Sequence, residues 1–274
     1  MSTESSAPDW DAAQSILSDA FGHFRANLDL LQKSNDPEVV HQARVGWRRF
    51  KSAVHLFKPL LQKDGIPANA TLQPVLKTLS RLRDLDVARF QTLPELSGVY
   101  MDGTAPRARE WERLRRIFAD ADRKQRLAIL ANLQDPDVQS TLENTSQWIA
   151  GLVSCGALSV SRGVANGEFR SWAKHRIRQM HKKLKVSKIN SDTAQSQHRT
   201  RILAKRLRYS IEALSDVLPR KMARDWYLEA SELQTRIGRT RDILRASTLA
   251  VELKVPKDIA QHLKDIASDL AQQE

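Results

Sequence analysis

Basic side chains recur three and four residues apart in two segments of the 274-residue sequence. In the first, His41, Arg44, Arg48, Lys51 and His55 fall within about 80° of arc on a helix. Like charges at this spacing repel by a few tenths of a kcal/mol per pair, so the pattern carries a cost. Guanidinium forks and lysine ammonium groups are suited to phosphate oxygens. The spacing therefore predicts a ridge that binds a linear polyanion, whereas the ordinary interpretation of such a charge run is a solvated helix face.

The second segment repeats the arrangement with His198, Arg201, Lys205 and Arg208. The basic helix expected over about 168–185 adds a third ridge, which consists of Arg178, His181, Lys182 and Lys185. Arg178 and Lys182 are the binding candidates that we take from this third ridge. The histidines that begin the first two ridges would donate hydrogen bonds when neutral and add charge when protonated.

The elements that carry these ridges are expected to be helices, because the apolar spacing is helical almost throughout and no alternating strand pattern is evident. Asp36-Pro37 and Asp135-Pro136 read as caps that open helices. Gly98–Pro106 is expected to be a loop, and residues 1–8 a disordered polar tail. The first two helices are expected over about 9–33 and 37–59. A third follows the turn at Asp64–Pro67 and ends near 91, and a fourth runs from the end of the loop to about 132. The others are expected over 135–155, 168–185, 192–217, 219–251 and 256–274.

The ridge helices are also amphipathic. Opposite the cations lie apolar residues that can face a core: Ala43, Phe50, Val54 and Phe57 in one helix, and Ala204, Leu207, Ile211 and Leu214 in the other.

Two pairs of segments indicate an internal duplication. Residues 41–51 align with 198–208 at an offset of 157, and residues 79–85 align with 237–243 at an offset of 158. Two matches at nearly the same offset favour two copies of one helical unit related by a pseudo-twofold axis. We therefore expect a single domain over 9–274, with a first half over 9–155 and a second over 156–274.

An Arg-Asp pair occurs in each copy, at Arg83-Asp84 and Arg241-Asp242. A carboxylate can act as a base or a metal ligand, but one carboxylate among several arginines favours a structural role, in which it orients a guanidinium. We expect it to orient a neighbouring basic residue such as Arg49 or Arg206, and both join the binding candidates.

The charge balance narrows the class of partner. The net charge is +12, and the segment from Phe169 to Ile211 holds thirteen Lys/Arg and one acid, Asp192. Such a surface favours nucleic acid, polyphosphate or an acidic membrane. No apolar stretch approaches the ~18 residues of a membrane span, and no secretory signal is evident, so a cytoplasmic protein is expected. The single cysteine, Cys155, excludes a disulfide scaffold and a cysteine-rich zinc site.

Other functional classes find less support. The sequence contains no Walker glycine loop, no paired acidic cluster suited to Mg²⁺ and no Ser-His-Asp signature, so no enzyme activity, metal or cofactor is expected. Nucleic-acid binding is the second candidate. It ranks below polyphosphate because Tyr209 is the only ring near the ridges for base stacking, and no zinc-finger or helix-turn-helix unit stands out.

Three motifs together resemble the CHAD domain family. They are His-x-x-Arg-Val-x-x-Arg-Arg-x-Lys from His41, Arg-Asp-Leu-Asp from Arg83, and His-x-x-Arg-Ile-x-x-Lys-Arg-x-Arg-Tyr from His198. The resemblance covers residue 9 to the end. It implies an all-helical fold of two four-helix bundles with pseudo-twofold symmetry and a basic central groove or pore. It also implies inorganic polyphosphate as the ligand, association with polyphosphate granules, and binding by His41, Arg44, Arg48, Lys51, His198, Arg201, Lys205 and Arg208.

Two departures from the family pattern affect these expectations. Many members carry an N-terminal CYTH triphosphatase domain, for which this chain has no room and whose Glu-x-Glu-x-Lys signature it lacks. A stand-alone member without hydrolase activity is therefore expected. The second Arg-Asp element continues as Ile243-Leu244, without the acid that the first copy has at Asp86, so it is expected to orient its partners differently.

Overall fold

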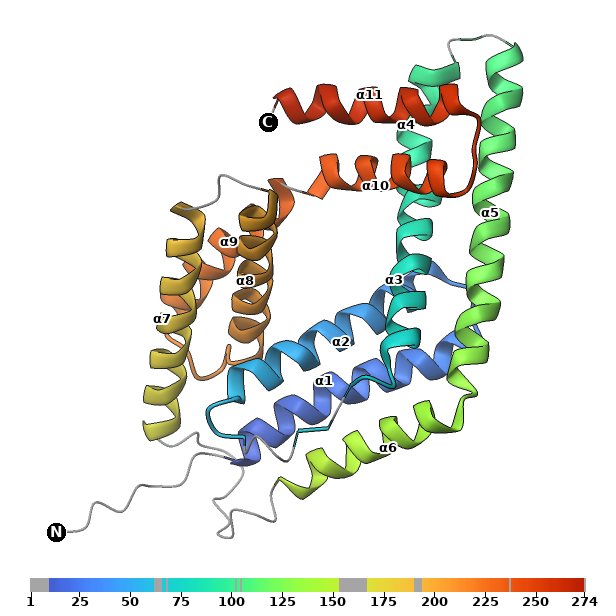
Figure 1. The fold of residues 1–274 in the computed structure, drawn as a ribbon. Helices are drawn as coiled ribbons and strands as arrows, with labels where there is room; N and C mark the ends of the chain where they lie inside the picture. The colour runs from blue at the N-terminus through green and yellow to red at the C-terminus, as the bar shows by residue number, and fades with distance from the viewer. Residues whose placement is uncertain are drawn as a thin grey trace, which may run out of the picture. The chain divides into compact units, whose positions relative to one another are not determined.

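The computed structural model describes residues 10–61, 66–67, 69–101, 103, 105–152, 167–189, 194–236 and 238–273. These residues form α-helices and one π-helical turn, without a strand among them, which confirms the all-α prediction (Figure 1). The elements are α1 Trp10–Leu31, α2 Pro37–Phe57, α3 Gln73–Val87, η2 Ala88–Thr92, α4 Leu93–Met101, α5 Ala105–Leu133, α6 Pro136–Gly151, α7 Gly167–Ile189, α8 Ala194–Ala213, α9 Arg220–Arg236, α10 Gly238–Glu252 and α11 Lys257–Gln273. None of the described helices is both long and apolar enough to cross a membrane. The predicted tail and most of the connection between the halves lie outside the described residues.

Local capping explains where two of the helices begin. The backbone N–H of Glu38 donates to Asp36 Oδ1 at 2.8 Å, and that of Asp137 donates to Asp135 Oδ1 at 2.9 Å. In each case a proline follows the cap at the first helical position, where its missing N–H has no intrahelical partner to lose. Both predicted helix starts are confirmed.

The segment around Pro94 differs from the prediction. Gly98–Met101 belongs to helix α4 and not to a loop, and the chain runs from α3 through η2 into α4. In the wide turn the backbone N–H of Leu93 donates to the carbonyl of Ala88. This π-helical turn changes the hydrogen-bond register just before Pro94, so the helix tolerates a residue that has no N–H to donate.

The helix predicted over 219–251 corresponds to α9 and α10, and residue 237 between them lies outside the described residues.

The chain divides into two compact units that interleave along the sequence. Unit 1 consists of Met1–Ala26, Val45–Ala68 and Ser140–Gln234, and unit 2 consists of Asn27–Arg44, Asn69–Gln139 and Thr235–Glu274. Each unit thus takes segments from both halves of the sequence. The expected boundary between halves at residue 155 and the two symmetric bundles stay predictions.

In unit 1, α1 and α2 pack closely around Gly46. A Cβ at Gly46 would lie 2.7 Å from the backbone nitrogen of Phe24, so only glycine fits there. Beside this contact an aromatic cluster joins the helices, with ring centroids 4.9 Å apart for Phe21 and Phe50 and 5.1 Å apart for Phe24 and Trp47. At the other end of α2 the ring of Phe57 stacks on Trp172 of α7. These contacts fix α2 by its apolar side.

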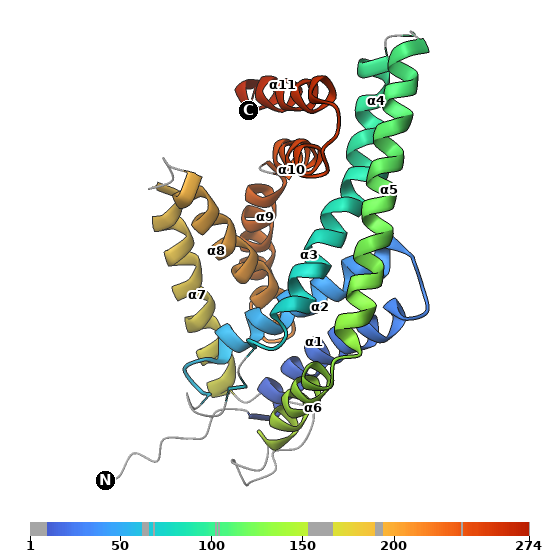
Figure 2. The ribbon, with the colours of Figure 1, turned by 45° about the vertical axis from the view of Figure 1, so that its right-hand side comes forward.

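In unit 2, an apolar core draws on α3, η2, α4, α5, α10 and α11. Leu85, Phe118 and Leu249 are among its fully buried members. Helices α3 and α5 run side by side, as do α10 and α11, in both views (Figures 1 and 2).

Candidate anion-binding site

The apolar backs of the two ridge helices are buried, as predicted. Ala43, Phe50 and Phe57 of α2 have almost no exposed surface, and Val54 is half-buried. The predicted core residues of the other ridge helix are buried as well: Ala204, Leu207 and Ile211 of α8, and Leu214 directly after it. With one face of each helix held in the core, the opposite face presents its cations.

Within unit 1, positive charges from three segments act on His55. Burial, and after it the charges of Arg206, Arg176, Lys183 and Lys58, together lower its pKa from 6.5 to about 4. The imidazole is therefore neutral at pH 7, and it can donate or accept a hydrogen bond without adding charge. We call these five residues the His55 cluster. It joins the end of α2 to α7 and α8.

Arg176, which the sequence analysis did not select, fixes the end of α2. Its Nε donates to the carbonyl oxygen of Leu56 at 3.1 Å, and its Nη2 donates to that of His55 at 2.9 Å. The last carbonyls of a helix have no intrahelical partner, and a cation there also interacts favourably with the helix dipole. Carbonyl oxygens hold the guanidinium in place without neutralising its charge.

Glu212 of α8 lies between two of the predicted binding residues. Its carboxylate is 3.6 Å from Arg49 of α2 and 3.7 Å from Arg208 of its own helix. The ridges of α2 and α8 therefore approach each other in unit 1. The prediction that an Arg-Asp pair orients Arg49 is wrong, because the carboxylate beside Arg49 is that of Glu212.

The remaining predicted residues of unit 1 lie on the surface or close to it. Lys51, Arg178, Lys182 and His198 are exposed, whereas Arg48, Arg201, Lys205 and Arg206 are half-buried. His181, predicted on the third ridge, is only 5% exposed. Its ring stacks on Trp226 at 4.0 Å, and its Nε2 lies 2.7 Å from a carboxylate oxygen of Glu229. These contacts attach α7 to α9, so His181 does not belong to the ridge.

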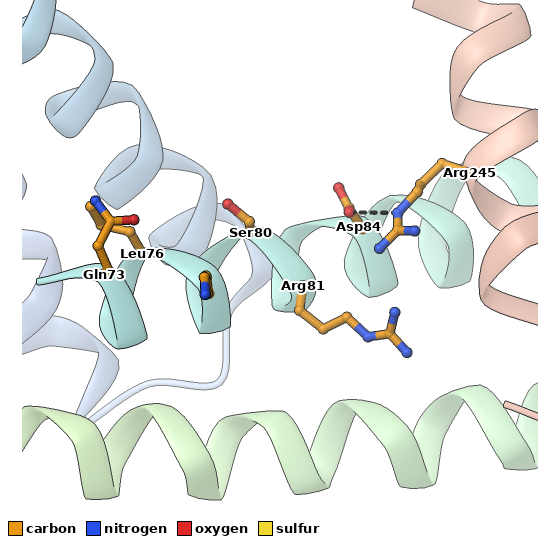
Figure 3. A pocket seen from close by; sticks show the side chains of 7 residues that line it. Gln73, Leu76, Ser80, Arg81, Asp84 and Arg245 are labelled. Atoms are coloured by element: carbon orange, nitrogen blue, oxygen red, sulfur yellow. Dashed lines mark hydrogen bonds and ion pairs between the residues drawn. The ribbon is translucent and has the colours of Figure 1, made fainter. Parts of the chain in front are cut away.

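His41 and Arg44, the first two members of the α2 ridge, belong to unit 2. Arg44 donates a hydrogen bond to the hydroxyl of Ser80 on α3. Ser80 also lines a cavity of about 370 Å³, together with Arg81 and Asp84 of α3 and Arg245 of α10 (Figure 3).

The two arginines of this cavity each have a carboxylate partner. Arg245 Nε donates to Asp84 Oδ2 at 2.7 Å (Figure 3). Arg81 pairs with Glu252. Burial, followed by the charge of Arg245, lowers the pKa of Arg81, and Asp84 opposes this. The first Arg-Asp pair therefore has the structural role expected of it, but the guanidinium that Asp84 fixes is that of Arg245.

Asp86, the second acid of the Arg-Asp-Leu-Asp motif, lies in a buried charge network and is 1% exposed. Arg126 of α5 is 3.1 Å from both Asp86 and Asp122, and Arg89 of η2 is 2.8 Å from Asp122. Desolvation raises the pKa of Asp86 from 3.8 to about 7, against the lowering effect of Arg126. The negative charge of Asp122 and its hydrogen bond with Asp86 raise the pKa of Asp86 further, so each acid disfavours ionisation of the other.

The second Arg-Asp pair is only partly described. Asp242 is exposed on α10, whereas the Arg241 side chain lies outside the described residues. Among the side chains that are described, no group of three or more His, Cys, Asp or Glu could hold a metal ion.

Comparison with known proteins places this fold. Residues 15–271 match the sequence model of the CHAD domain. The crystal structure of the CHAD domain from the plant Ricinus communis superposes with a TM-score of 0.77 at 24% identity, over 100% of this chain and 89% of that one. PptA from Streptomyces chartreusis superposes with a TM-score of 0.65 at 19% identity, over 96% of this chain and 93% of its own. No curated protein matches significantly. At these identities the two structures show a shared fold.

Proposed function

The chain belongs to the CHAD domain family, and from this premise we propose that it binds inorganic polyphosphate through the His55 cluster and the ridge residues around it. The main support is the convergence of Arg206, Arg176, Lys183 and Lys58 on His55, whose pKa is lowered to about 4 by burial and then by these four positive charges. Cations that disfavour one more proton also favour an arriving anion, because both effects follow from the same local potential.

The proposed contacts follow from the chemistry of each group. Arginine forks bind pairs of phosphate oxygens, lysines add point charges, and neutral His55 donates a hydrogen bond. The proposed set in unit 1 is His55, Lys58, Arg48, Arg49, Lys51, Arg176, Arg178, Lys182, Lys183, His198, Arg201, Lys205, Arg206 and Arg208. Within unit 2, His41 and Arg44 are proposed as separate contacts for the same ligand class.

The proposed activity is binding without hydrolysis, in association with polyphosphate granules. A phosphotransferase that depends on a metal needs carboxylates among its cations. Glu212 lies between Arg49 and Arg208, at 3.6 and 3.7 Å, so its carboxylate pairs with two arginines. One carboxylate paired in this way does not make a metal site. Purified protein should therefore release no phosphate from polyphosphate or nucleoside triphosphates, with or without Mg²⁺. Steady turnover that a single substitution in the cluster abolishes would contradict this.

Nucleic acid is the second candidate for the same cations. Base binding without sequence preference uses exposed rings for stacking. Tyr209, which directly follows Arg208, is buried, and so are Trp47 and Phe50 beside Arg48 and Lys51. The guanidinium of Arg208 lies 4.8 Å from the Tyr209 ring centroid. This burial favours polyphosphate over nucleic acid at the cluster.

The test is a titration with long-chain polyphosphate, double-stranded DNA and single-stranded RNA at matched phosphate concentration and moderate salt. Polyphosphate should bind most tightly. Equal affinities that fall together as salt rises would instead indicate a general polycation effect.

A charge-reversal pair locates the binding. Lys183→Glu with Arg206→Glu should weaken polyphosphate binding about 100-fold and lower the slope of log Kd against log salt by about 2. The matched control is Arg123→Glu with Lys124→Glu on α5, which changes the net charge equally at exposed positions. Circular dichroism should show unchanged helix content in both. Equal losses in the two variants would assign the binding to net charge alone.

A further inference from the structure

A second cavity, of about 350 Å³, lies in unit 2 at the π-helical turn. Arg89 and Phe90 of η2 and Pro94 of α4 line one side, and Glu112, Arg115 and Arg116 of α5 line the other. This volume is within the usual range of small-molecule sites. The cavity combines an aromatic ring with three guanidinium groups, and neither the His55 cluster nor the Asp84 cavity offers that combination of residues.

The ring of Phe90 is held in place, yet it is 54% exposed. The Arg89 guanidinium lies 4.8 Å from the ring centroid and is itself fixed by Asp122 at 2.8 Å. One face of the ring is thus covered by a cation whose position a buried carboxylate determines. A planar ligand would stack on the exposed surface of the ring that Arg89 does not cover. Such π-helical turns within helices are frequent at functional sites.

The α5 side of the cavity carries uncompensated positive charge. Arg115 and Arg116 share one carboxylate, that of Glu112, at 3.4 and 3.7 Å. Their side chains are 66% and 74% exposed. Long, solvated ion pairs of this kind contribute little and rearrange readily, so both guanidinium groups can turn towards an anion.

We propose that this cavity binds a nucleoside phosphate, with the base stacked on Phe90 and the phosphates on Arg115 and Arg116. A bare phosphate chain would make no use of the ring, whereas every nucleobase has a π-face that stacks on an aromatic side chain. The site is separate from the polyphosphate site proposed above, because it uses none of its residues. The nucleoside phosphate is either a free nucleotide or one nucleotide of a single strand.

The experiment is a calorimetric titration of the full chain with ATP, inorganic tripolyphosphate, adenosine and a single-stranded oligoadenylate, without divalent cations. ATP should bind more tightly than tripolyphosphate, which lacks the base, and than adenosine, which lacks the charge. Binding of the oligoadenylate alone would support the proposal with a strand as the source. Binding of ATP would support a free nucleotide.

Two variants test the two parts of the cavity. Phe90→Leu should weaken ATP binding about tenfold and leave tripolyphosphate binding unchanged, and Phe90→Trp should restore ATP affinity. Arg115→Gln with Arg116→Gln should also weaken ATP binding about tenfold or more. Arg123→Gln with Lys124→Gln, on the same helix, is the matched control. Because Phe90 is largely exposed, the leucine variant should keep its helix content, which circular dichroism checks.

Equal affinity for ATP and tripolyphosphate, together with no effect of Phe90→Leu, would overturn the proposal. So would failure of ATP and oligoadenylate to bind at millimolar concentration. Long-chain polyphosphate binding should persist in Phe90→Leu, and ATP binding should persist in the Lys183→Glu, Arg206→Glu variant. Each proposal can therefore fail while the other stands.

Discussion

Arg176 in unit 1 and two arginines in unit 2, Arg126 and Arg245, are held in place by different kinds of oxygen. In unit 1, Arg176 is fixed by the main-chain carbonyls of His55 and Leu56. In unit 2, Arg245 is fixed by the carboxylate of Asp84, and Arg126 by those of Asp86 and Asp122. A carbonyl orients a guanidinium and leaves its charge intact, whereas a carboxylate neutralises it. Arg176 therefore keeps its positive charge beside the other cations of the His55 cluster, whereas the charges of Arg126 and Arg245 are compensated by carboxylates.

The largest effect should come from breaking the buried network of unit 2. Arg126→Met leaves Asp86 and Asp122 buried without their shared cation, which should lower the free energy of unfolding by about 3–5 kcal/mol. The matched change in unit 1, Arg206→Met, should leave stability within about 0.5 kcal/mol or raise it, because it relieves repulsion. Urea denaturation measures both. Similar losses in the two variants would mean that the units do not differ in this way.

Asp86 should make stability depend on pH in one direction. Its pKa is raised from 3.8 to about 7, so the folded state binds the proton more tightly than the unfolded state. The corresponding stability is present below about pH 4 and is lost as the pH rises through 7. Asp86→Asn should remove this dependence, which amounts to roughly 2–4 kcal/mol. Denaturation midpoints between pH 4 and 8 measure it, and parallel curves for the two proteins would contradict it.

His55 should make stability depend on pH in the direction opposite to Asp86. Its pKa is lowered to about 4, so its contribution is present above pH 6.5 and is lost as the pH falls from 6.5 through 4. His55→Gln should flatten the curve in that range by about 1 kcal/mol, a value reduced by solvent screening of a half-exposed ring. Saturating polyphosphate should flatten the wild-type curve as well, because bound anions favour the imidazolium. An unchanged slope in the variant would exclude His55 from the cluster.

The smallest effect on stability is expected from removing the carboxylate of Glu212 in unit 1. Glu212→Gln should cost no more than about 0.5 kcal/mol in stability, because the ion pairs with Arg49 and Arg208 are long. The two arginines then become available to phosphate, so polyphosphate affinity should rise about two- to threefold. This corresponds to about 0.4–0.7 kcal/mol of binding free energy. Glu143→Gln, which removes the partner of Arg25 between α1 and α6, is the control. Weaker binding in Glu212→Gln would mean that the carboxylate orients the arginines productively.

The fold was predictable where local chemistry determines it. The caps at Asp36 and Asp135 use backbone donors two residues away, so the sequence around each suffices to locate a helix start. The helical path through Pro94 was not predictable in the same way. A proline usually interrupts a helix, and a π-helical turn that accommodates it has no clear signal in the sequence.

The candidate site was predictable only within single helices. Spacing located the ridges and their apolar backs, but His181 has ridge spacing and is buried because Trp226, on another helix, covers it. The partner of Asp84 is Arg245, 161 residues further along the chain, which helix periodicity cannot reveal. The role of Arg176 is only weakly indicated by the sequence. A helix that ends just before Pro59 has carbonyls in need of donors, and a cation from elsewhere is a common solution.

The interleaving of the units also shapes how the protein is made. Unit 1 needs residues from both Met1–Ala26 and Ser140–Gln234, and unit 2 needs Thr235–Glu274 as well as its earlier segments. Neither unit has all of its segments while the first half of the chain is emerging from the ribosome. Helices α1 and α2 can pack on each other around Gly46 early, but Phe57 is synthesised long before Trp172, on which it stacks. Contacts so distant in sequence close slowly, so the apolar surface around Phe57 stays uncovered until α7 has been synthesised.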